Sequence, residues 1–259
     1  MKKRTALISA MLSLMPLGQP LIFKTSAFLS TIGFFLSISE KVYAGDYSYY
    51  FDRAYNKAES GDHYGAISDY TKAIEINSND SSAFHNRGVA RENLKQCYEA
   101  ISDYLRAIEI KSNRSTSYQG IGNCKALLGD NKGAISAYTK AIEIDPNLAP
   151  AYLGSGNSKD FLKDYYGAIS DFTKAIEIDP QFGMAYNNRG HVKSNLKDYY
   201  GAISDFTKAI EIDPQFGMAF SNRGIVKEKI GDLQGACNDW SNASYFGYQR
   251  AGRLYKEKC

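Results

Sequence analysis

Residues 162–185 read LKDYYGAISDFTKAIEIDPQFGMA, and residues 196–219 repeat the same letters 34 positions later. A catalytic site needs different side chains that converge from different elements, so two identical copies this close together argue against catalysis. A structural unit that stacks on its neighbours, in contrast, can be copied whole. The duplication therefore predicts a repeat protein.

The 34-residue period extends through most of the chain. Six units fit it and together span residues 47–250. The units are residues 47–80, 81–114, 115–148, 149–182, 183–216 and 217–250. Residues 251–259 follow, and Ala251, Leu254 and Tyr255 fall on one helical face. We expect a terminal helix here that covers the last apolar surface of the repeats.

Each unit has the pattern of a helix pair. Its first half places an aromatic residue at the fourth position and a small residue four positions later, and its second half places Ala, an aromatic residue and Ala at positions 20, 24 and 27. Spacings of three and four keep these side chains on one helical face. An acidic residue between the halves is well placed to cap the second helix, in five of the units. These residues are Asp62, Asp130, Asp164, Asp198 and Asp232.

The end of the second helix is also marked in three units. Pro146, Pro180 and Pro214 stand at position 32, where a missing N–H group and the restricted preceding residue stop a helix. The other three units have a different residue at this place, and there we expect less sharp helix ends. These residues are Ser78, Ser112 and Tyr248.

This pattern resembles the tetratricopeptide repeat family, whose mark is an aromatic residue, a Gly or Ala, then Ala, an aromatic residue and Ala, then Pro at these places. The resemblance implies an all-α fold, a right-handed superhelical solenoid of six 34-residue helix-turn-helix repeats with a C-terminal capping helix. It also implies a concave groove, lined by the first helix of each repeat, that holds an extended peptide or a partner's helix.

In the family, repeat positions 2, 5, 9, 12 and 13 line this groove. The candidate groove residues are therefore Phe51, Tyr55, His85, Val89, Gln119, Asn123, Leu153, Asn157, Asp160, Met184, Asn187, His191, Asn195, Ser221 and Ile225, with Glu92, Phe161, Met218 and Glu228 beside them. Amides can bond the backbone of an extended chain without demanding its sequence. For each amide taken singly, an ordinary solvated polar side chain is the alternative.

One family subclass grips a C-terminal carboxylate through Lys and Asn in one repeat and Lys and Arg two repeats later. Phe51 and Tyr55 stand where the first Lys and Asn are needed, and Thr116 and Gly120 replace the final Lys and Arg. The resemblance therefore disfavours chaperone-tail binding of that type.

An arginine recurs at position 7 and an aspartate at position 23. The arginines are Arg53, Arg87, Arg189 and Arg223, and the aspartates are Asp69, Asp103, Asp171, Asp205 and Asp239. An anion-binding ladder is one interpretation, but the third unit lacks both partners, as expected if Arg and Asp pair within a unit. The fourth unit keeps Asp171 beside Ser155, against this correlation. We predict a structural ion pair.

Four cysteines and three histidines are present. No C-x-x-C pair occurs and the histidines are scattered, so a zinc site is not expected. In an exported protein the cysteines could form disulfides, Cys237 with Cys259 and Cys97 with Cys124; buried free thiols are the alternative.

The N-terminus reads as a secretory signal peptide. Residues 1–44 contain a basic start, apolar runs, and Val42 and Ala44 at the small-residue positions of a cleavage site before Gly45. An uncleaved membrane anchor is the alternative. The basic side chains of this segment account for the net charge of +3, and the remaining chain is slightly acidic. We therefore expect no nucleic-acid partner.

The sequence favours a non-enzymatic interaction scaffold without a cofactor, exported to the periplasm of a bacterium, or to the thylakoid lumen of a photosynthetic one. It would bind a protein or peptide for assembly or maturation of a complex. The Asp–Ser pairs of the second helices have no paired His, and no glycine-rich phosphate loop occurs. A self-associating structural module, stacked through matching repeat surfaces, and a membrane-anchored assembly factor are the alternatives.

Overall fold

A computed structural model describes residues 46–259 of the protein. The described part contains thirteen helices and no strand. The first helix covers residues 46–59, and the others are α3 (His63–Ile76), α4 (Ser81–Asn93), α5 (Cys97–Ile110), α6 (Ser115–Leu127), α7 (Asn131–Ile144), α8 (Ala149–Phe161), α9 (Tyr165–Ile178), α10 (Gly183–Asn195), α11 (Tyr199–Ile212), α12 (Gly217–Lys229), α13 (Leu233–Tyr245) and α14 (Gln249–Lys258). The expected signal peptide or anchor lies outside the described residues. None of the described helices is long and apolar enough to cross a membrane.

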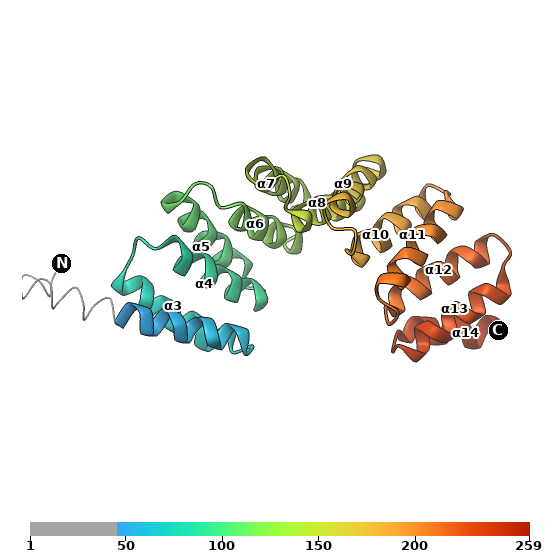
Figure 1. Ribbon diagram of the computed structural model, residues 1–259, viewed down its shortest axis with the longest axis horizontal. Helices are drawn as coiled ribbons and strands as arrows, with labels where there is room; N and C mark the ends of the chain where they lie inside the picture. The colour runs from blue at the N-terminus through green and yellow to red at the C-terminus, as the bar shows by residue number, and fades with distance from the viewer. Residues whose placement is uncertain (1–45) are drawn as a thin grey trace, which may run out of the picture. The chain divides into compact units, whose positions relative to one another are not determined.

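The helices form six consecutive pairs, as the 34-residue period predicts. The helices of each pair pack on each other, in repeat 1 through a cluster that joins Ala54 to Ala66 and Tyr70. Each second helix, from α3 to α11, also packs on the first helix of the next repeat. The first helices α4, α6, α8, α10 and α12 also contact one another in that order. Among the described residues no comparable contact joins the second helices. The result is an all-α repeat solenoid, in which α6, α8 and α10 lie on the inner side of the curve and α7 and α9 on its outer side (Figure 1).

A buried aromatic ring from each second helix packs on the first helix of its own repeat. In repeat 2, a Cβ atom added to Gly88 would lie 2.8 Å from Tyr104 Cε1, closer than two carbons can approach without repulsion. The same contact recurs in the four later repeats. The pairs are Gly122 with Tyr138, Gly156 with Phe172, Gly190 with Phe206 and Gly224 with Trp240. The predicted small residue is therefore what allows the two helices to approach.

The predicted helix caps are confirmed. Each of the five aspartates accepts a hydrogen bond from the backbone N–H of a glycine three residues later, at 2.9–3.1 Å. The expectation of less sharp ends in repeats 1 and 2 is wrong. Helices α3 and α5 end at Ile76 and Ile110, the repeat position at which Ile144 precedes the Pro146 turn. Their cap residues still bond to the carbonyl four residues back, so proline is not required for the stop.

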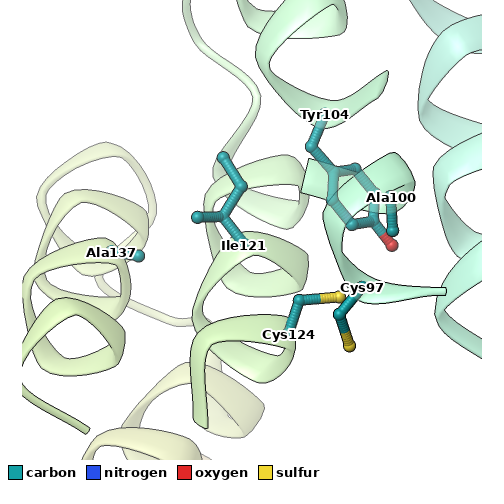
Figure 2. Close-up of a cluster of buried hydrophobic side chains, with 6 residues drawn as sticks. All are labelled: Cys97, Ala100, Tyr104, Ile121, Cys124 and Ala137. Carbon is teal, nitrogen blue, oxygen red and sulfur yellow. The ribbon is translucent and has the colours of Figure 1, made fainter. Parts of the chain in front are cut away.

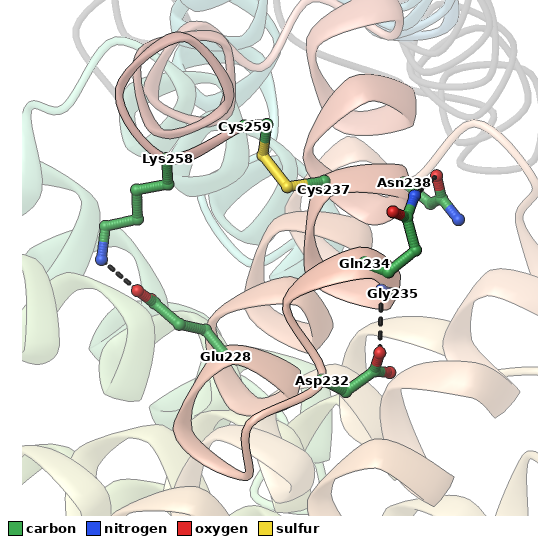
Figure 3. Close-up of a disulfide and its surroundings, with 8 residues drawn as sticks. All are labelled: Glu228, Asp232, Gln234, Gly235, Cys237, Asn238, Lys258 and Cys259. Atoms are coloured by element: carbon green, nitrogen blue, oxygen red, sulfur yellow. Dashed lines mark hydrogen bonds and ion pairs between the residues drawn. A yellow bond between two sulfur atoms is a disulfide. The ribbon is translucent and has the colours of Figure 1, made fainter.

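The terminal helix α14 closes the C-terminal end of the repeats. It packs on α13, and Ala251 is buried in a cluster with Trp240 and Ala243. Tyr255, which we expected on the buried face, remains 43% exposed. The predicted disulfide between Cys237 and Cys259 is present, and its Cα atoms lie 5.8 Å apart (Figure 3).

A second feature in Figure 3 holds α14 in place. Lys258 of α14 forms an ion pair with Glu228, an inner-side residue of α12. The disulfide and this ion pair together attach the last helix to both helices of repeat 6.

The other expected disulfide is absent. Cys97 and Cys124 are free thiols, buried in one cluster with Ala100, Tyr104 and Ile121 (Figure 2). Burial raises the pKa of the Cys124 thiol, because a thiolate there would lose its hydration. Since the thiolate is the form that reacts, this environment disfavours oxidation. The alternative of buried free thiols is therefore correct here.

Candidate functional site: the inner layer of first helices

The candidate groove residues differ in their access to solvent. Six are exposed: Tyr55, Val89, Asn157, Met184, His191 and Asn195. Seven are half-buried: Phe51, His85, Gln119, Asn123, Leu153, Asp160 and Ile225. Asn187 and Ser221 are only 2% and 1% exposed, so the expectation that they line an open groove is wrong. Asn187 bonds to Met218 and Asn222 of α12, so the packing of the next first helix contributes to its burial.

Buried Asn187 belongs to a chain of amides that crosses three repeats. Asn188 donates to Asn157 Oδ1 at 2.8 Å, Asn187 donates to Asn188 Oδ1 at 2.9 Å, and Asn222 donates to Asn187 Oδ1 at 3.1 Å. These bonds connect α8, α10 and α12. The exposed Nδ2 group of Asn157 makes no hydrogen bond within residues 46–259, so it can donate to a peptide carbonyl.

A different network holds the inner side of repeats 2 and 3. Tyr104 donates its hydroxyl to Glu92 Oε2 at 2.6 Å, and Asn123 donates to Glu92 Oε1 at 2.8 Å. Tyr138 donates to Asn123 Oδ1, also at 2.8 Å. Burial raises the pKa of both tyrosine hydroxyls, and the nearby Glu92 carboxylate raises that of Tyr104 further. The side chains of Glu92 and Asn123 are therefore already engaged in hydrogen bonds within the protein.

Two further candidates meet on the inner side. His191 Nδ1 of α10 lies 3.5 Å from Asp160 Oδ2 of α8. Both come from first helices of neighbouring repeats, and His191 is exposed. This pair, with Asn157 one turn earlier on α8, provides adjacent polar groups that solvent reaches.

The recurring arginine and aspartate form a structural ion pair, as predicted. In repeat 5, Arg189 Nε and Nη2 donate to the two carboxylate oxygens of Asp205 at 2.9 and 2.7 Å. Lys193 adds a contact of 2.8 Å to the same carboxylate. Repeats 1, 2 and 6 contain the same bidentate pair. In repeat 1, hydrogen bonds from Arg53, the largest contribution, lower the pKa of Asp69 to about 2.

The exception in repeat 4 has a local explanation. Among the described residues Asp171 has no arginine partner, because Ser155 stands at position 7, but Lys159 lies 2.7 Å from its carboxylate. A cation at position 11 therefore replaces the arginine. Sequence reasoning missed this residue, although a Lys or Arg occurs at position 11 in every repeat.

A pocket of about 480 Å³ lies at the N-terminal end of the inner layer. The candidate residues Phe51, Tyr55 and His85 line one part of it. The remaining lining comes from α4, from the turn between α5 and α6 and from the start of α6: Ser82, Asn86, Lys111, Asn113, Arg114, Ser115 and Thr116. No group of three or more His, Cys, Asp or Glu side chains that could hold a metal ion occurs in residues 46–259.

Two family models, both described as tetratricopeptide repeat, match the chain. One matches residues 47–80, 81–114, 115–148 and 149–182, and the other matches residues 184–216. These matches cover more than half of the chain. The chain belongs to the tetratricopeptide repeat family. Repeat 6 lies outside the matched residues, but α12 and α13 form the same helix pair.

Solved structures share the fold. MamA is 24% identical, with a TM-score of 0.58 over 66% of this chain and 94% of MamA. YrrB, described as a tetratricopeptide repeat protein with an unusual peptide-binding site, is 23% identical, with a TM-score of 0.58 over 72% of this chain and 97% of YrrB. PilF of Pseudomonas aeruginosa is 13% identical, with a TM-score of 0.70 over 82% of this chain and 99% of PilF. No curated protein matches the sequence. At these identities the likeness shows the fold alone.

Proposed function

We propose that the protein is a non-catalytic interaction scaffold that binds an extended segment or a helix of a partner protein along its inner layer, for assembly or maturation of a complex. The observation that carries this proposal is the continuous layer of first helices, on which Asn157, Asp160 and His191 leave polar groups accessible. The peptide-binding site named for YrrB supports this use of the fold. Because fold alone does not determine function, the inner layer needs a direct test.

Site-specific photo-crosslinking in the full chain provides this test. A photoreactive residue replaces Asn157 on the inner side or, as a matched control, Tyr166 on the second helix of the same repeat, which is 78% exposed. We expect crosslinks to a discrete partner protein from position 157 and not from position 166. Equal crosslinking from both positions, or crosslinking from position 166 alone, would overturn the proposal.

A second variant tests whether the polar groups themselves contribute. Asn157→Ala, Asp160→Ala and His191→Ala together remove the accessible groups, and Asn187 is left unchanged because it is buried. We expect weaker capture of the partner that position 157 crosslinks, with an unchanged far-ultraviolet circular dichroism spectrum. A folded variant that captures the partner as well as the unaltered protein does would place recognition elsewhere.

Stacking of copies through the C-terminal end is less favoured. An open end would expose the apolar surface of α13, but α14 covers that surface and ends in the charged run Lys256–Glu257–Lys258. Terminal helices with a polar outer face keep repeat proteins from stacking.

We further propose that the protein is exported and that residues 1–44 are removed. The intact mass of the protein isolated from its own cells tests this. A mass that begins at Gly45 supports export, and a mass that includes residues 1–44 supports the membrane anchor instead.

A further inference from the structure

The pocket at the N-terminal end of the inner layer contains two cations that form no ion pair with a carboxylate of residues 46–259. Arg114 donates through Nη2 to Ser82 Oγ at 2.8 Å, while its Nε group is buried and has no partner within residues 46–259. Lys111 is exposed and forms no ion pair in the described part of the chain. No Asp or Glu is among the residues that line the pocket.

Asp80, whose carboxylate acts on Arg114, is already in use. Asp80 accepts hydrogen bonds from the Tyr47 hydroxyl and from the Ser82 backbone N–H. Burial lowers the pKa of the Arg114 guanidinium, and Asp80 only partly opposes this effect. A partly buried guanidinium with a free N–H group gains stability when a carboxylate enters, because the fixed N–H fork of arginine matches two carboxylate oxygens.

The turn that carries these cations differs from the corresponding turns of repeats 3, 4 and 5. Repeats 3, 4 and 5 have Asp at the place of Lys111, and each Asp accepts a hydrogen bond from a backbone N–H within the turn. They have Leu148, Phe182 and Phe216 at the place of Arg114. Repeat 2 therefore replaces an acidic and an apolar residue with two basic ones, and the pocket lies at this turn.

The opposite side of the pocket is aromatic. Phe51 is half-buried and packs edge-on against Tyr70, while Tyr55 is 50% exposed. Asn86, Asn113 and Thr116 add polar groups to the lining. A ligand that suits this lining presents a carboxylate to one side and an apolar group to the other.

We propose that this pocket binds a carboxylate of the partner segment, with a neighbouring apolar side chain on Phe51 and Tyr55. The proposal rests on the proposed function, since it names the chemistry that the inner layer recognises at one end. The cations come from the turn before α6 and not from the helix positions that the carboxylate-gripping subclass uses.

Nuclear magnetic resonance titration of the full chain with two short, end-blocked peptides tests this proposal. The peptides are acetyl-Leu-Asp-Leu-amide and its isostere acetyl-Leu-Asn-Leu-amide, and the main signal is the Arg114 Nε–H resonance. We expect binding of the Asp peptide to be about tenfold tighter, because a hydrogen bond from a guanidinium to a carboxylate is stronger than one to a neutral amide. A third peptide, acetyl-Leu-Leu-Leu with a free C-terminal carboxylate, shows whether a chain end serves as well as a side chain.

The control variant is Lys111→Asp with Arg114→Leu, which rebuilds the turn of repeat 3 and should therefore fold. We expect it to bind the Asp and Asn peptides equally. Equal binding of the two peptides by the unaltered protein, or a preference for Asp that survives in the variant, would overturn the proposal. An Arg114 shift with inorganic phosphate as large as that with the Asp peptide would also overturn it.

The two proposals can fail separately. Crosslinking from position 157 without any preference for the Asp peptide would support the scaffold proposal and contradict the proposed carboxylate site. A clear preference for the Asp peptide with crosslinking confined to position 166 would support the carboxylate site and contradict the inner layer as the main docking surface.

Discussion

Repeat 3 (residues 115–148) and repeat 5 (residues 183–216) form the same pair of helices with different side chains. Repeat 5 joins its helices through Arg189 and Asp205, whereas repeat 3 has Ile121 and Ala137 at these places. The 34-residue pattern thus determines which positions of the two helices contact each other. Either an ion pair or an apolar pair can make that contact.

The junctions to the following repeats differ as well. Tyr138 of repeat 3 packs on Gly154, where an added Cβ atom would lie 2.4 Å from the ring. Phe206 of repeat 5 has Asn222 at the position of Gly154. A tyrosine hydroxyl in the first junction and an amide in the second supply the polar groups of the inner side. The polar groups of the inner surface therefore depend on which ring and which contacting residue stand on either side of each junction between repeats.

Breaking the ion pair of repeat 5 should have the largest effect. Asp205→Ala leaves Arg189 and Lys193, whose side chains are 15% and 22% exposed, without their shared carboxylate. We expect the free energy of unfolding to fall by about 4 kcal/mol, since removal of one partner leaves a poorly solvated charge. Urea unfolding followed by circular dichroism measures this loss.

The control for this prediction introduces the apolar residues of repeat 3 at the same two positions of repeat 5. Arg189→Ile combined with Asp205→Ala should recover most of the loss, because an apolar pair can replace a buried ion pair. A double variant as unstable as Asp205→Ala would show that the two repeats are not interchangeable at this place.

Filling the glycine of the first junction should have the next largest effect. Gly154→Asn forces a side chain into the ring of Tyr138, so we expect a loss of about 3 kcal/mol, as in overpacked cores. Adding Tyr138→Phe reproduces the Phe–Asn junction of repeat 5 and frees the ring from Asn123. The double variant should therefore recover at least about 1 kcal/mol, measured as a coupling energy in a double-mutant cycle. Additive losses would mean that the ring and the amide do not compete for the same space.

Acid should weaken the contact between repeats 2 and 3. Burial, with a smaller effect of Arg114, lowers the pKa of His85 from its ordinary value of 6.5 to about 4, and its Nδ1 atom lies 2.8 Å from Ser117 Oγ. Between these two pKa values the unfolded chain binds a proton that the folded chain does not, so stability falls as pH falls. We expect a loss of about 2 kcal/mol between pH 7 and pH 5.

The matched variant isolates the histidine. His85→Asn keeps a polar group near Ser117 but does not titrate, so its unfolding free energy should change less over this range. Repeats 4 and 5 have Leu153 and Asn187 at the equivalent places, which carry no titratable group. Equal pH dependence of the two proteins would show that His85 is not the cause.

The sequence predicted the features that depend on residues within one repeat. The helix caps such as Asp164, the packing of Gly156 on Phe172 and the pairing of Arg189 with Asp205 all follow from fixed spacings. The burial of Asn187 could not be predicted, because it depends on the next first helix and on Asn222, 35 residues later.

The candidate site shows the same division. The family positions identified Phe51, Tyr55 and His85, which do line the N-terminal pocket. They did not identify Lys111 and Arg114, because the turn between repeats is not among the groove positions. The sequence does show that this turn is basic in repeat 2, where repeats 3 to 5 have an acidic and an apolar residue. Only the structure shows that the turn borders a pocket.

The smallest effect that we expect concerns a bond between repeats 5 and 6. Arg223 Nη1 donates to Thr207 Oγ1 at 3.0 Å, so that the arginine of one repeat also holds the second helix of the repeat before it. Thr207→Val keeps the shape of the side chain and removes the acceptor, which should reduce the unfolding free energy by about 1 kcal/mol. Thr139 occupies the same position in repeat 3, where the following repeat offers Ser155 in place of an arginine. Within residues 46–259 the Thr139 hydroxyl bonds only to its own helix. Thr139→Val should therefore cost much less. Similar losses in both variants, measured by urea unfolding, would assign the effect to the helix and not to the arginine that links the repeats.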